Sequence, residues 1–511
     1  MENRKLNNIV VVGGGTAGWL AALCVRAFVP KAKVTLIESD SIGVLGAGEG
    51  TTPSFVTLLD FLGIPVSTLV KETNTTMKSG IRFTNWNNDG KYFDHTFFYN
   101  PTSDFYPLAC NPALSYKVVN DIPNDGHLFD LLSKENKVAF SFREAPAGPN
   151  PIQAFEAMAN FSIHFDAIQL SKLFRGIGTE RGIERVEGKV IDINTNEYEE
   201  ISSLVLEDGK EIECDFVFDC TGFAKLIIGN FYNAEWTSYK DQLTVDSALP
   251  FFLKREEELP AFTEATAMKY GWMWRIPLQH RLGCGYVFDS QYITDEEAKQ
   301  EIEEYLGYVP EYPRGDKGSF KFKAGVYKTP WIKNCIAVGL SAGFIEPLEA
   351  TSIQVLAYQL IQALTEPLNL AKRDETYAKV YNERVSDYNE ELMSFIYWHY
   401  MTKRDDTEFW RSFHDINKAP ELCQYYLKSW EYEIPNFYQF YQRINFSEDS
   451  WLTVGAGLGL MNKDHLEKYF EENEQVRERC KEVVDNQLMK EKFTAMRCAT
   501  HSEFLDYLKN N

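Results

Sequence analysis

The chain has 511 residues, of which 44% are hydrophobic and 25% charged, as is typical of a globular protein with a large core. Its net charge of -22 and its pI near 4.9 argue against binding of nucleic acid or of an anionic membrane surface. The nine cysteines and eight histidines are dispersed, which indicates reduced thiols in a cytoplasmic protein and predicts no metal site. No targeting segment is evident.

The first predicted elements form a dinucleotide-binding unit. The segment NNIVVVGGGTAGWLAALCVRAF predicts a strand, a glycine turn and a helix, and VTLIES (34–39) predicts a second strand. Gly13, Gly15 and Gly18 form the pattern GxGxxG in that turn, and Glu38 ends the second strand. Such glycines allow a pyrophosphate to approach the backbone at a helix N-terminus, and such an acid accepts hydrogen bonds from ribose hydroxyls.

Further strands follow, and the last part of the chain changes character. IERVEGKVIDI (183–193) and SLVLEDGKEIE, with its Asp208-Gly209 turn, predict paired strands, and CDFVFDCTGF (214–223) predicts a buried strand. Residues 334–364 again predict a strand, a turn and a helix, and long helical stretches dominate after Thr365. We therefore expect a core over 1–364, with inserted segments on the substrate side, and a helical region over 365–511 that covers the substrate site.

Several motifs resemble those of a known enzyme family. Residues 272–277, WMWRIP, resemble the WxWxIP motif of flavin-dependent halogenases of the tryptophan-halogenase-like family. Other stretches agree in the same order: GGGTAGW (13–19), LGAGEGTTP (45–53), KSGIRFTNW (78–86), HFDAIQL (164–170), DCTGF (219–223), GLSAGFIEPLEATSI (339–353) and HYMTKRDDTEFW (399–410). The resemblance implies an α/β fold with an FAD-binding, Rossmann-like core of the aromatic-hydroxylase type and a mostly helical C-terminal region. It leaves a viral or phage origin open.

The family's chemistry gives Lys78 and Glu349 their expected roles. In that family, reduced FAD and oxygen convert a halide into hypohalous acid, which reaches a lysine that delivers the halogen to an aromatic ring. Lys78 occupies the position of that lysine, although without the resemblance a solvated surface lysine would be the ordinary interpretation. Glu349 matches the family's essential glutamate, which orients the electrophile and accepts the ring proton, whereas an acid in a first helical turn is the plain alternative. Glu346 is the nearby competitor and is expected to be structural.

The resemblance also assigns binding residues. FAD is expected at a set of residues in and around the glycine turn and the two later motifs: Gly13, Gly15, Thr16, Ala17, Gly18, Glu38, Ala47, Val190, Leu340 and Ile353. The backbone amides of Thr351 and Ser352 are expected to hold the halide. Trp272 and Trp274 are expected to keep organic substrates from the flavin, although core aromatics are the alternative. Phe97, Asn100 and Trp451 are expected near the substrate or its channel.

Two departures from the family affect substrate and halide. Relatives that act on free tryptophan carry Ser-Thr-Gly after the glutamate, where this chain has Ala350, Thr351 and Ser352. Serine in place of glycine restricts the backbone, which affects how chloride is handled. Bromide and iodide are easier to oxidise than chloride and would therefore place smaller demands on the site. Asn100 stands where those relatives place a histidine against the indole. An indole-like or other electron-rich aromatic substrate is therefore favoured over free tryptophan.

The resemblance further implies FADH2 delivered by diffusion from a separate flavin reductase, and it leaves a homo-oligomer open. Two alternatives remain: an FAD-dependent aromatic hydroxylase (monooxygenase) and an inactive flavin-binding protein. Hydroxylases of this fold typically carry Gly-Asp where this chain has Gly339-Leu340, and they would leave Lys78 and WMWRIP unexplained. The presence of both Lys78 and Glu349 argues against a loss of activity.

Overall fold

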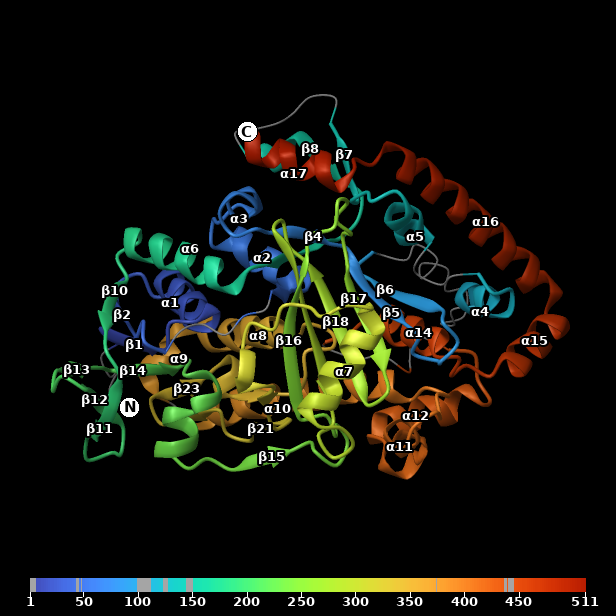
Figure 1. Ribbon diagram of the computed structural model, residues 1–511. Helices are drawn as coiled ribbons and strands as arrows, with labels where there is room; N and C mark the ends of the chain where they lie inside the picture. The colour runs from blue at the N-terminus through green and yellow to red at the C-terminus, as the bar shows by residue number, and fades with distance from the viewer. Residues whose placement is uncertain are drawn as a thin grey trace. The chain divides into compact units, whose positions relative to one another are not determined.

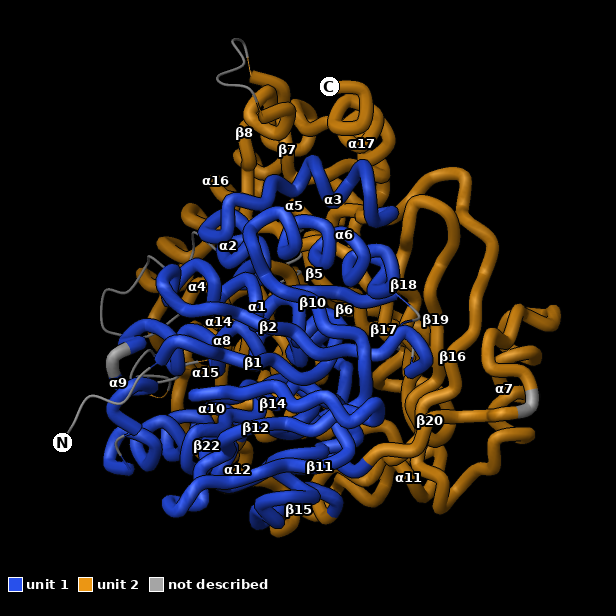
Figure 2. Tube along the Cα trace, turned by 90° about the vertical axis from the view of Figure 1, so that its left-hand side faces the viewer, with its two compact units in different colours: residues 1–74, 165–240, 323–389 blue, residues 75–164, 241–322, 390–511 orange. Residues whose placement is uncertain are grey.

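The computed structural model (Figure 1) consists of two compact units, which Figure 2 draws in different colours. It describes residues 6–42, 46, 48–98, 112–122, 127–143, 150–373, 375–435, 439 and 445–511. Unit 1 comprises residues 1–74, 165–240 and 323–389, and unit 2 comprises 75–164, 241–322 and 390–511. Each unit is thus assembled from three stretches that alternate along the chain. The predicted division at residue 364 concerned flavin-binding and substrate-covering roles, which this partition does not test.

Unit 1 is built on a sheet whose strand order is β10-β2-β1-β14-β23-β22. Its strands are β1 (Asn8–Val12), β2 (Lys33–Glu38), β10 (Glu184–Glu187), β14 (Phe216–Asp219), β22 (Trp331–Ile332) and β23 (Cys335–Ala337). All neighbouring pairs are parallel except β22 with β23. A parallel sheet is covered on both faces, so its strands are apolar at successive positions, as in the run IVVV of β1. This arrangement confirms the predicted Rossmann-like α/β core.

Helices and two small sheets complete unit 1. Its helices are α1 (Thr16–Phe28), α2 (Pro53–Phe61), α3 (Val66–Glu72), α6 (Ala167–Glu180), α8 (Ser352–Leu364) and α9 (Pro367–Lys372). Helix α1 packs against α6 and α8. One small sheet contains β11 (Val190–Thr195), β12 (Ile201–Leu206) and β13 (Glu211–Glu213), and the other contains β15 (Trp236–Ser238), β21 (Gly325–Tyr327) and β24 (Gly343–Phe344).

The predicted segment 183–193 is divided between two sheets. Its first half, β10, joins the parallel sheet beside β2, whereas its second half, β11, pairs with β12 in the small antiparallel sheet. Gly188 separates the halves, and its amide bonds to Glu38 O at 2.9 Å. The alternation of side chains was read correctly as strand, but alternation alone does not show that a chain changes sheets. The hairpin at Asp208-Gly209 is confirmed, since β12 pairs with β13.

Unit 2 is built on a sheet whose strand order is β20-β16-β19-β18-β17-β5-β6. Its strands are β5 (Gly80–Thr84), β6 (Tyr92–Thr96), β16 (Ser247–Lys254), β17 (Thr263–Met268), β18 (Gly271–Pro277), β19 (Arg281–Phe288) and β20 (Phe320–Lys321). Helix α7 (Asp295–Leu306) contributes Ala298 and Ile302 to a core formed by one face of this sheet. Two further antiparallel pairs are β4 (Thr76–Lys78) with β9 (Ser162–Phe165), and β7 (Phe140–Phe142) with β8 (Phe155–Ala157).

Helices make up most of the chain after residue 365, as predicted. Helix α10 (Glu375–Tyr400) begins in unit 1 and ends in unit 2. The other helices of unit 2 are α4 (Pro112–Val119), α5 (His127–Lys134), α11 (Glu408–Arg411), α12 (Glu421–Trp430), α14 (Glu448–Gly457), α15 (Lys463–Glu472), α16 (Glu474–Arg497) and α17 (His501–Asn510). Their packing is strongly aromatic, which explains the many Trp, Tyr and Phe residues in this part of the sequence.

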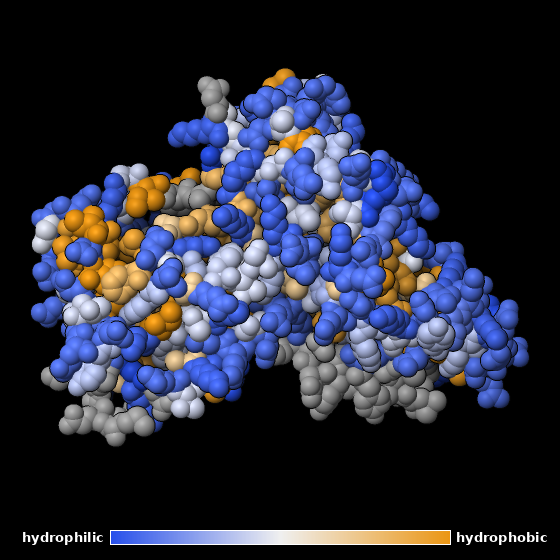
Figure 3. Space-filling model, turned by 90° about the horizontal axis from the view of Figure 1, so that it is seen from below, coloured by the Kyte–Doolittle hydropathy of each residue, from blue (hydrophilic) through white to orange (hydrophobic). Residues whose placement is uncertain are grey.

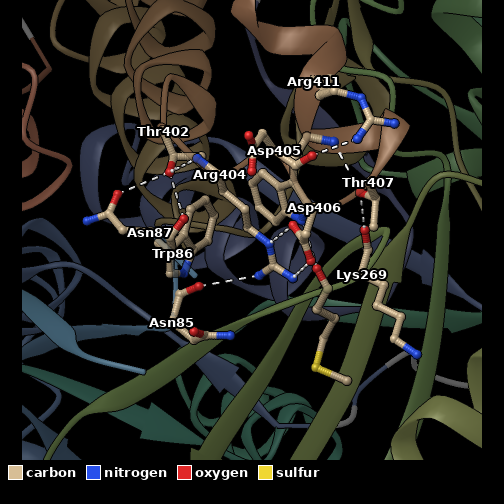
Figure 4. A network of polar contacts seen from close by, with 12 residues as sticks. Asn85, Trp86, Asn87, Lys269, Thr402, Arg404, Asp405, Asp406, Thr407 and Arg411 are labelled. Carbon is tan, nitrogen blue, oxygen red and sulfur yellow. Dashed lines mark hydrogen bonds and ion pairs between the residues drawn. The ribbon is translucent and has the colours of Figure 1, made fainter. Parts of the chain in front are cut away.

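The loop after α10 anchors the end of the segment that begins with Lys78 (Figure 4). Thr402 Oγ1 donates to Trp86 O at 2.7 Å, and Arg404 Nη1 donates to Asn85 O at 3.3 Å. Asp406 accepts from Arg404 Nε and Nη2 at 2.6 and 2.8 Å, and this bidentate pair fixes the guanidinium. The HYMTKRDDTEFW motif therefore has a structural role within unit 2.

Within the described residues, no single helix is both long and apolar enough to cross a membrane. The bent pair α2 and α3 passes that test only by combined length and composition. Most of its apolar side chains, including Leu59 and Leu69, are buried in the protein, although Phe61 at the end of α2 is exposed. The face drawn in Figure 3 is mostly hydrophilic, with hydrophobic residues gathered in limited patches, which agrees with the high net charge.

Candidate active site

The glycine turn of unit 1 has room for a pyrophosphate. Helix α1 begins at Thr16, and its N-cap, Gly15, provides no side-chain hydrogen bond. A Cβ built on Gly15 would meet no atom within 4 Å, whereas one on Gly18 would overlap Gly13 O. Thr16 Oγ1 is buried and has no hydrogen-bond partner among the residues placed. An open surface beside a helix N-terminus and an unpaired hydroxyl fit the phosphates of FAD.

Glu38 lies beside this turn, but two arginines already bind it. Arg185 Nε and Arg175 Nη2 lie 2.5 and 2.8 Å from Glu38 Oε1. The other carboxylate oxygen lies against Gly14, where any Cβ would overlap it. Gly14 is therefore required by contact with Glu38. Hydrogen bonding of Glu38 to a ribose stays a prediction. The oxygen that would accept the bond is Oε2, because both arginines form their ion pairs with Oε1.

The remaining cofactor-site residues also lie in unit 1. Gly339, in the turn that contains Leu340, lies between two helices, since its Cβ would be 3.3 Å from Ala17 of α1 and 3.8 Å from Leu356 of α8. Ile353 is buried in the first turn of α8, and Val190 is half-buried at the start of β11. The structure thus brings Ala17 close to the turn of Leu340. Ala47 lies outside the described residues.

The end of the EPLEATSI motif forms a buried turn that leads into α8. Glu349 is only 1% exposed and precedes Ala350, whose φ of +55° is left-handed. Thr351 then adopts φ −86° and ψ −11°, and α8 begins at Ser352. A left-handed residue followed by a right-handed one curves successive amides around a small concave surface that attracts anions. Among the residues with assigned positions, the amides of Thr351 and Ser352 donate to no acceptor.

Ser352 occupies a helical position, so its backbone does not require glycine. The expected difficulty with serine there has no conformational basis, because the left-handed residue is Ala350 instead. Left-handed alanine costs about 1–2 kcal/mol relative to the right-handed conformation. The strain lies next to the proposed halide amides and the buried Glu349.

We expect Ala350→Gly to raise the free energy of unfolding by about 0.5–1 kcal/mol, because glycine adopts positive φ without strain. Ala357→Gly, in the middle of α8, is the matched control and should lower it by about 1 kcal/mol. Urea denaturation of both variants measures the difference. Equal destabilisation by the two substitutions would contradict the left-handed conformation at Ala350.

Lys78 is fully buried in unit 2, so it is not a surface lysine. It ends β4, where it pairs with Ser162 of β9, and Thr76 pairs with His164. Alternate residues of a strand share a face, which places the side chains of Thr76, Lys78, Ser162 and His164 together. Lys78 Nζ lies 5.2 Å from the centroid of the Phe97 ring. Phe97, a predicted substrate or channel residue, therefore lies beside the predicted catalytic lysine.

His164 is held as a neutral imidazole beside Lys78. Thr76 Oγ1 donates its proton to Pro277 O at 2.6 Å, so it must accept from His164 Nδ1–H at 3.1 Å. The other nitrogen, Nε2, then accepts from Thr263 Oγ1 at 2.9 Å. Burial, followed by the positive charge of Lys78, lowers the pKa of His164 well below its usual value. The neighbour of Lys78 therefore remains uncharged.

A second neutral histidine contacts the same strand from the C-terminal helix. His501 Nε2 accepts from the amide of Met77 at 3.0 Å, and Nδ1–H donates to Leu259 O at 3.0 Å. Its side chain is fully buried, and burial lowers its pKa from 6.5 to about 4. Sequence reasoning missed both histidines. His164 stood in the HFDAIQL motif, whereas no local pattern indicates that His501 reaches β4.

The low pKa of His501 predicts a loss of stability in acid. Above pH 6.5 the imidazole is neutral in both states, whereas between 6.5 and about 4 the unfolded chain binds the proton more readily. The free energy of unfolding should therefore fall as the pH drops through this window, by about 3 kcal/mol at most for this group. Urea midpoints of the wild type and His501→Gln across that range measure the effect. Parallel pH profiles of the two proteins would contradict it.

The aromatic residues of the site lie in unit 2. Trp272 is 1% exposed, and Trp274 lies over Gly285 of β19, where a Cβ would overlap the indole. Trp451 of α14 is fully buried and packs 5.0 Å from the rings of Phe395 and Tyr426. The indole nitrogens of Trp272 and Trp451 have no hydrogen-bond partner in the part of the chain that the structure describes. Asn100 lies outside those residues.

Comparison with known proteins identifies the family. The family model described as tryptophan halogenase matches residues 8–472. The chain belongs to the tryptophan halogenase family. Tryptophan 6-halogenase SttH of Streptomyces toxytricini is 28% identical over 491 residues, which cover 90% of each chain. Tryptophan 7-halogenase RebH of Lentzea aerocolonigenes is 29% identical over 499 residues, 89% of this chain and 90% of RebH.

Solved halogenase structures agree with this assignment. Xcc4156, a flavin-dependent halogenase from Xanthomonas campestris, has a TM-score of 0.81 and 29% identity over 98% of each chain. A tryptophan halogenase from Shewanella frigidimarina has a TM-score of 0.84 and 25% identity, covering 100% of this chain and 99% of its own. These comparisons confirm the predicted family and fold. The suggestion of a viral or phage origin has no support in them.

Membership of the tryptophan halogenase family establishes the type of enzyme and its cofactor. The chain is an FADH2-dependent halogenase, hence an oxidoreductase and flavoprotein. Its FADH2 comes from a separate flavin reductase, and its other reactants are a halide and an aromatic substrate. Lys78 and Glu349 belong to different compact units, and the amides of Thr351 and Ser352 lie in the same unit as Glu349.

Proposed function

We propose that this halogenase acts on an indole-like or other electron-rich aromatic compound, with Lys78 delivering the halogen and Glu349 accepting the ring proton. The burial of Lys78 carries the proposal. Lysine side chains are rarely buried completely, so a lysine that is 0% exposed and lies beside a neutral imidazole is a candidate for a catalytic role. The plain interpretation as a solvated surface residue does not fit that environment.

The halide is held by the amides of Thr351 and Ser352. Their amides follow the left-handed Ala350 and belong to the N-terminal end of α8, whose dipole favours an anion. When reduced FAD is bound, its reaction with oxygen would provide the oxidant that converts this halide to hypohalous acid. Because the site offers backbone amides rather than a charged side chain, it binds chloride, bromide and iodide by the same contacts. Ease of oxidation then favours bromide and iodide.

Lys78 transfers the electrophilic halogen. Its amine takes the halogen from hypohalous acid and releases water, or it holds the intact acid by a hydrogen bond; either form presents the halogen to an electron-rich ring carbon. Burial keeps bulk water from competing for the reactive halogen. The neutral state of His164 means that no second positive charge is added beside the amine.

Glu349 completes the substitution. When the ring carbon forms its bond to the halogen, the ring becomes cationic and must lose a proton to regain aromaticity. A buried carboxylate stabilises that cation and accepts the proton. Trp272 and Trp274 fill space that would otherwise admit organic molecules to the flavin. Trp451, Phe97 and Asn100 are proposed to contact the substrate.

Product analysis with a substrate panel tests the proposal. The protein is incubated with FAD, NADH, a flavin reductase and oxygen, and chloride, bromide and iodide are offered separately with indoles, phenols and free tryptophan. Catalase removes peroxide, and Lys78→Ala is the control. We expect halogenated product from at least one indole, with bromide or iodide giving more than chloride. Equal product from Lys78→Ala would overturn the proposed role of the lysine.

A further inference from the structure

The C-terminal helix α17 reaches the strand that carries Lys78. The amide of Met77, the residue before Lys78, donates to His501 Nε2 at 3.0 Å. The other imidazole nitrogen donates to Leu259 O at 3.0 Å, so the ring links β4 to the segment before β17. Donation at Nδ1 leaves the lone pair of Nε2 available to Met77. These two residues are 424 positions apart in the chain.

We propose that His501 is a positioning residue for Lys78: its imidazole accepts the Met77 amide and thereby fixes the backbone from which the lysine side chain extends. The proposal rests on the role proposed above for Lys78. His501 lies beyond residues 8–472, which the tryptophan halogenase model matches. It therefore adds a contact from a part of the chain that the family match does not include.

The position of Met77 in β4 explains why an acceptor is needed. Strand β4 has three residues and pairs with β9 along one edge. Because the Met77 amide bonds to His501, it points away from β9, where a strand edge would otherwise leave a buried donor without an acceptor. The neighbouring residues are already fixed. Ser79 donates from its amide to Ala261 O at 2.7 Å, and Thr76 bonds to Pro277 and His164.

The imidazole is itself held in place by the start of α17. Thr500 and Glu503 form a capping box, and the His501 amide donates to Asn136 O at 2.7 Å. Phe504 packs 4.4 and 4.6 Å from the rings of Phe140 and Phe155. The imidazole therefore occupies a defined place rather than a range of rotamers. Besides burial, Lys78 and His501 lower the pKa of His164, and Arg255 lowers the pKa of His501.

Two conservative substitutions separate the bond to Met77 from the packing of the helix. In His501→Gln the side-chain amide reaches the place of Nε2 and can accept from Met77. In His501→Asn the amide reaches only the place of Nδ1, so the bond to Leu259 is kept and the bond to Met77 is lost. Phe504→Leu is the matched control, because it loosens the same helix without touching either bond.

Two measurements are made on each full-length variant. Amide hydrogen exchange, followed by mass spectrometry of the peptide that contains Met77, reports the hydrogen bond without any turnover. The second measurement is the ratio of halogenated arene to halogenated dimedone, a soluble diketone that traps hypohalous acid escaping from the protein. Misplacing Lys78 should lower this ratio while halide oxidation continues.

We expect His501→Asn to raise exchange of this peptide and to lower the ratio, each by at least about tenfold, and His501→Gln and Phe504→Leu to remain near wild type. Equal values for the Asn and Gln variants, or an equal loss in Phe504→Leu, would overturn the proposal. So would rapid exchange of the Met77 amide in the wild type, which requires no variant to fold. If Lys78→Ala keeps the wild-type ratio, the proposed function fails independently of His501.

Discussion

Lys78→Ala is expected to lose halogenated product by at least about 10³-fold while its affinity for FAD stays within about twofold of wild type. The side chain is fully buried in unit 2, next to His164 and the Phe97 ring, whereas the glycine turn and α1 lie in unit 1. Removing the amine therefore removes the halogen carrier without altering any residue expected to bind FAD. Initial rates by liquid chromatography and FAD binding by fluorescence measure the two quantities.

Lys78→Met and Lys78→Arg are the controls for this substitution. Methionine keeps the length and apolar stem of the side chain, so its packing loss is smaller than that of alanine. Arginine keeps a positive charge but has no amine that could accept halogen in the same way. All three variants should be inactive if the amine itself is required. Turnover by the arginine variant at more than about a tenth of wild type would show that charge alone suffices.

Glu349→Gln is expected to lower halogenation by about 10²–10³-fold, with little change in the binding of FAD. The glutamine keeps the shape of the side chain and one acceptor oxygen, replaces the other oxygen by a donor, and cannot take up the ring proton. Glu346→Gln is a matched control within the same motif, because Glu346 is also 1% exposed and lies three residues earlier. It should retain most of the activity. Initial rates with a single indole and saturating bromide measure both variants.

A larger loss in Glu346→Gln than in Glu349→Gln would reverse the two assignments. Equal losses would mean that the buried pair acts as one unit. Thermal unfolding of each variant shows whether a loss of activity reflects a loss of folded protein, since removing one buried carboxylate can leave its partners unsatisfied.

The sequence was informative where local pattern determines structure. The strand, glycine turn and helix at 7–28 and the hairpin at Asp208-Gly209 are present as predicted, because each depends on residues adjacent in the chain. The Rossmann-like sheet follows from these units, since parallel strands need helical crossovers. WMWRIP forms one strand, β18, whose alternation places Trp272 and Trp274 on the same face.

Other features depend on contacts that no local pattern records. Alternation predicted strand over 183–193 but could not show that β10 and β11 join different sheets. The glycine fingerprint indicated that Glu38 binds a ribose, but it could not show that Arg175 and Arg185, which are distant in the sequence, form ion pairs with it. Serine in place of glycine was expected to restrict the backbone at Ser352, whereas the left-handed residue of this motif is Ala350. The Thr500–Glu503 capping box was readable from the sequence, but the contact of His501 with Met77 was not.

The central claim is that the enzyme transfers halogen, and not oxygen, to the aromatic ring. One incubation under isotopically heavy oxygen gas tests this claim most directly. The protein receives FADH2 from a flavin reductase, with bromide, an indole and catalase. The product mass is then read by mass spectrometry. We expect a product that has gained bromine and no heavy oxygen, and that is absent with Lys78→Ala. A product that carries heavy oxygen and no bromine would contradict this and identify a hydroxylating enzyme.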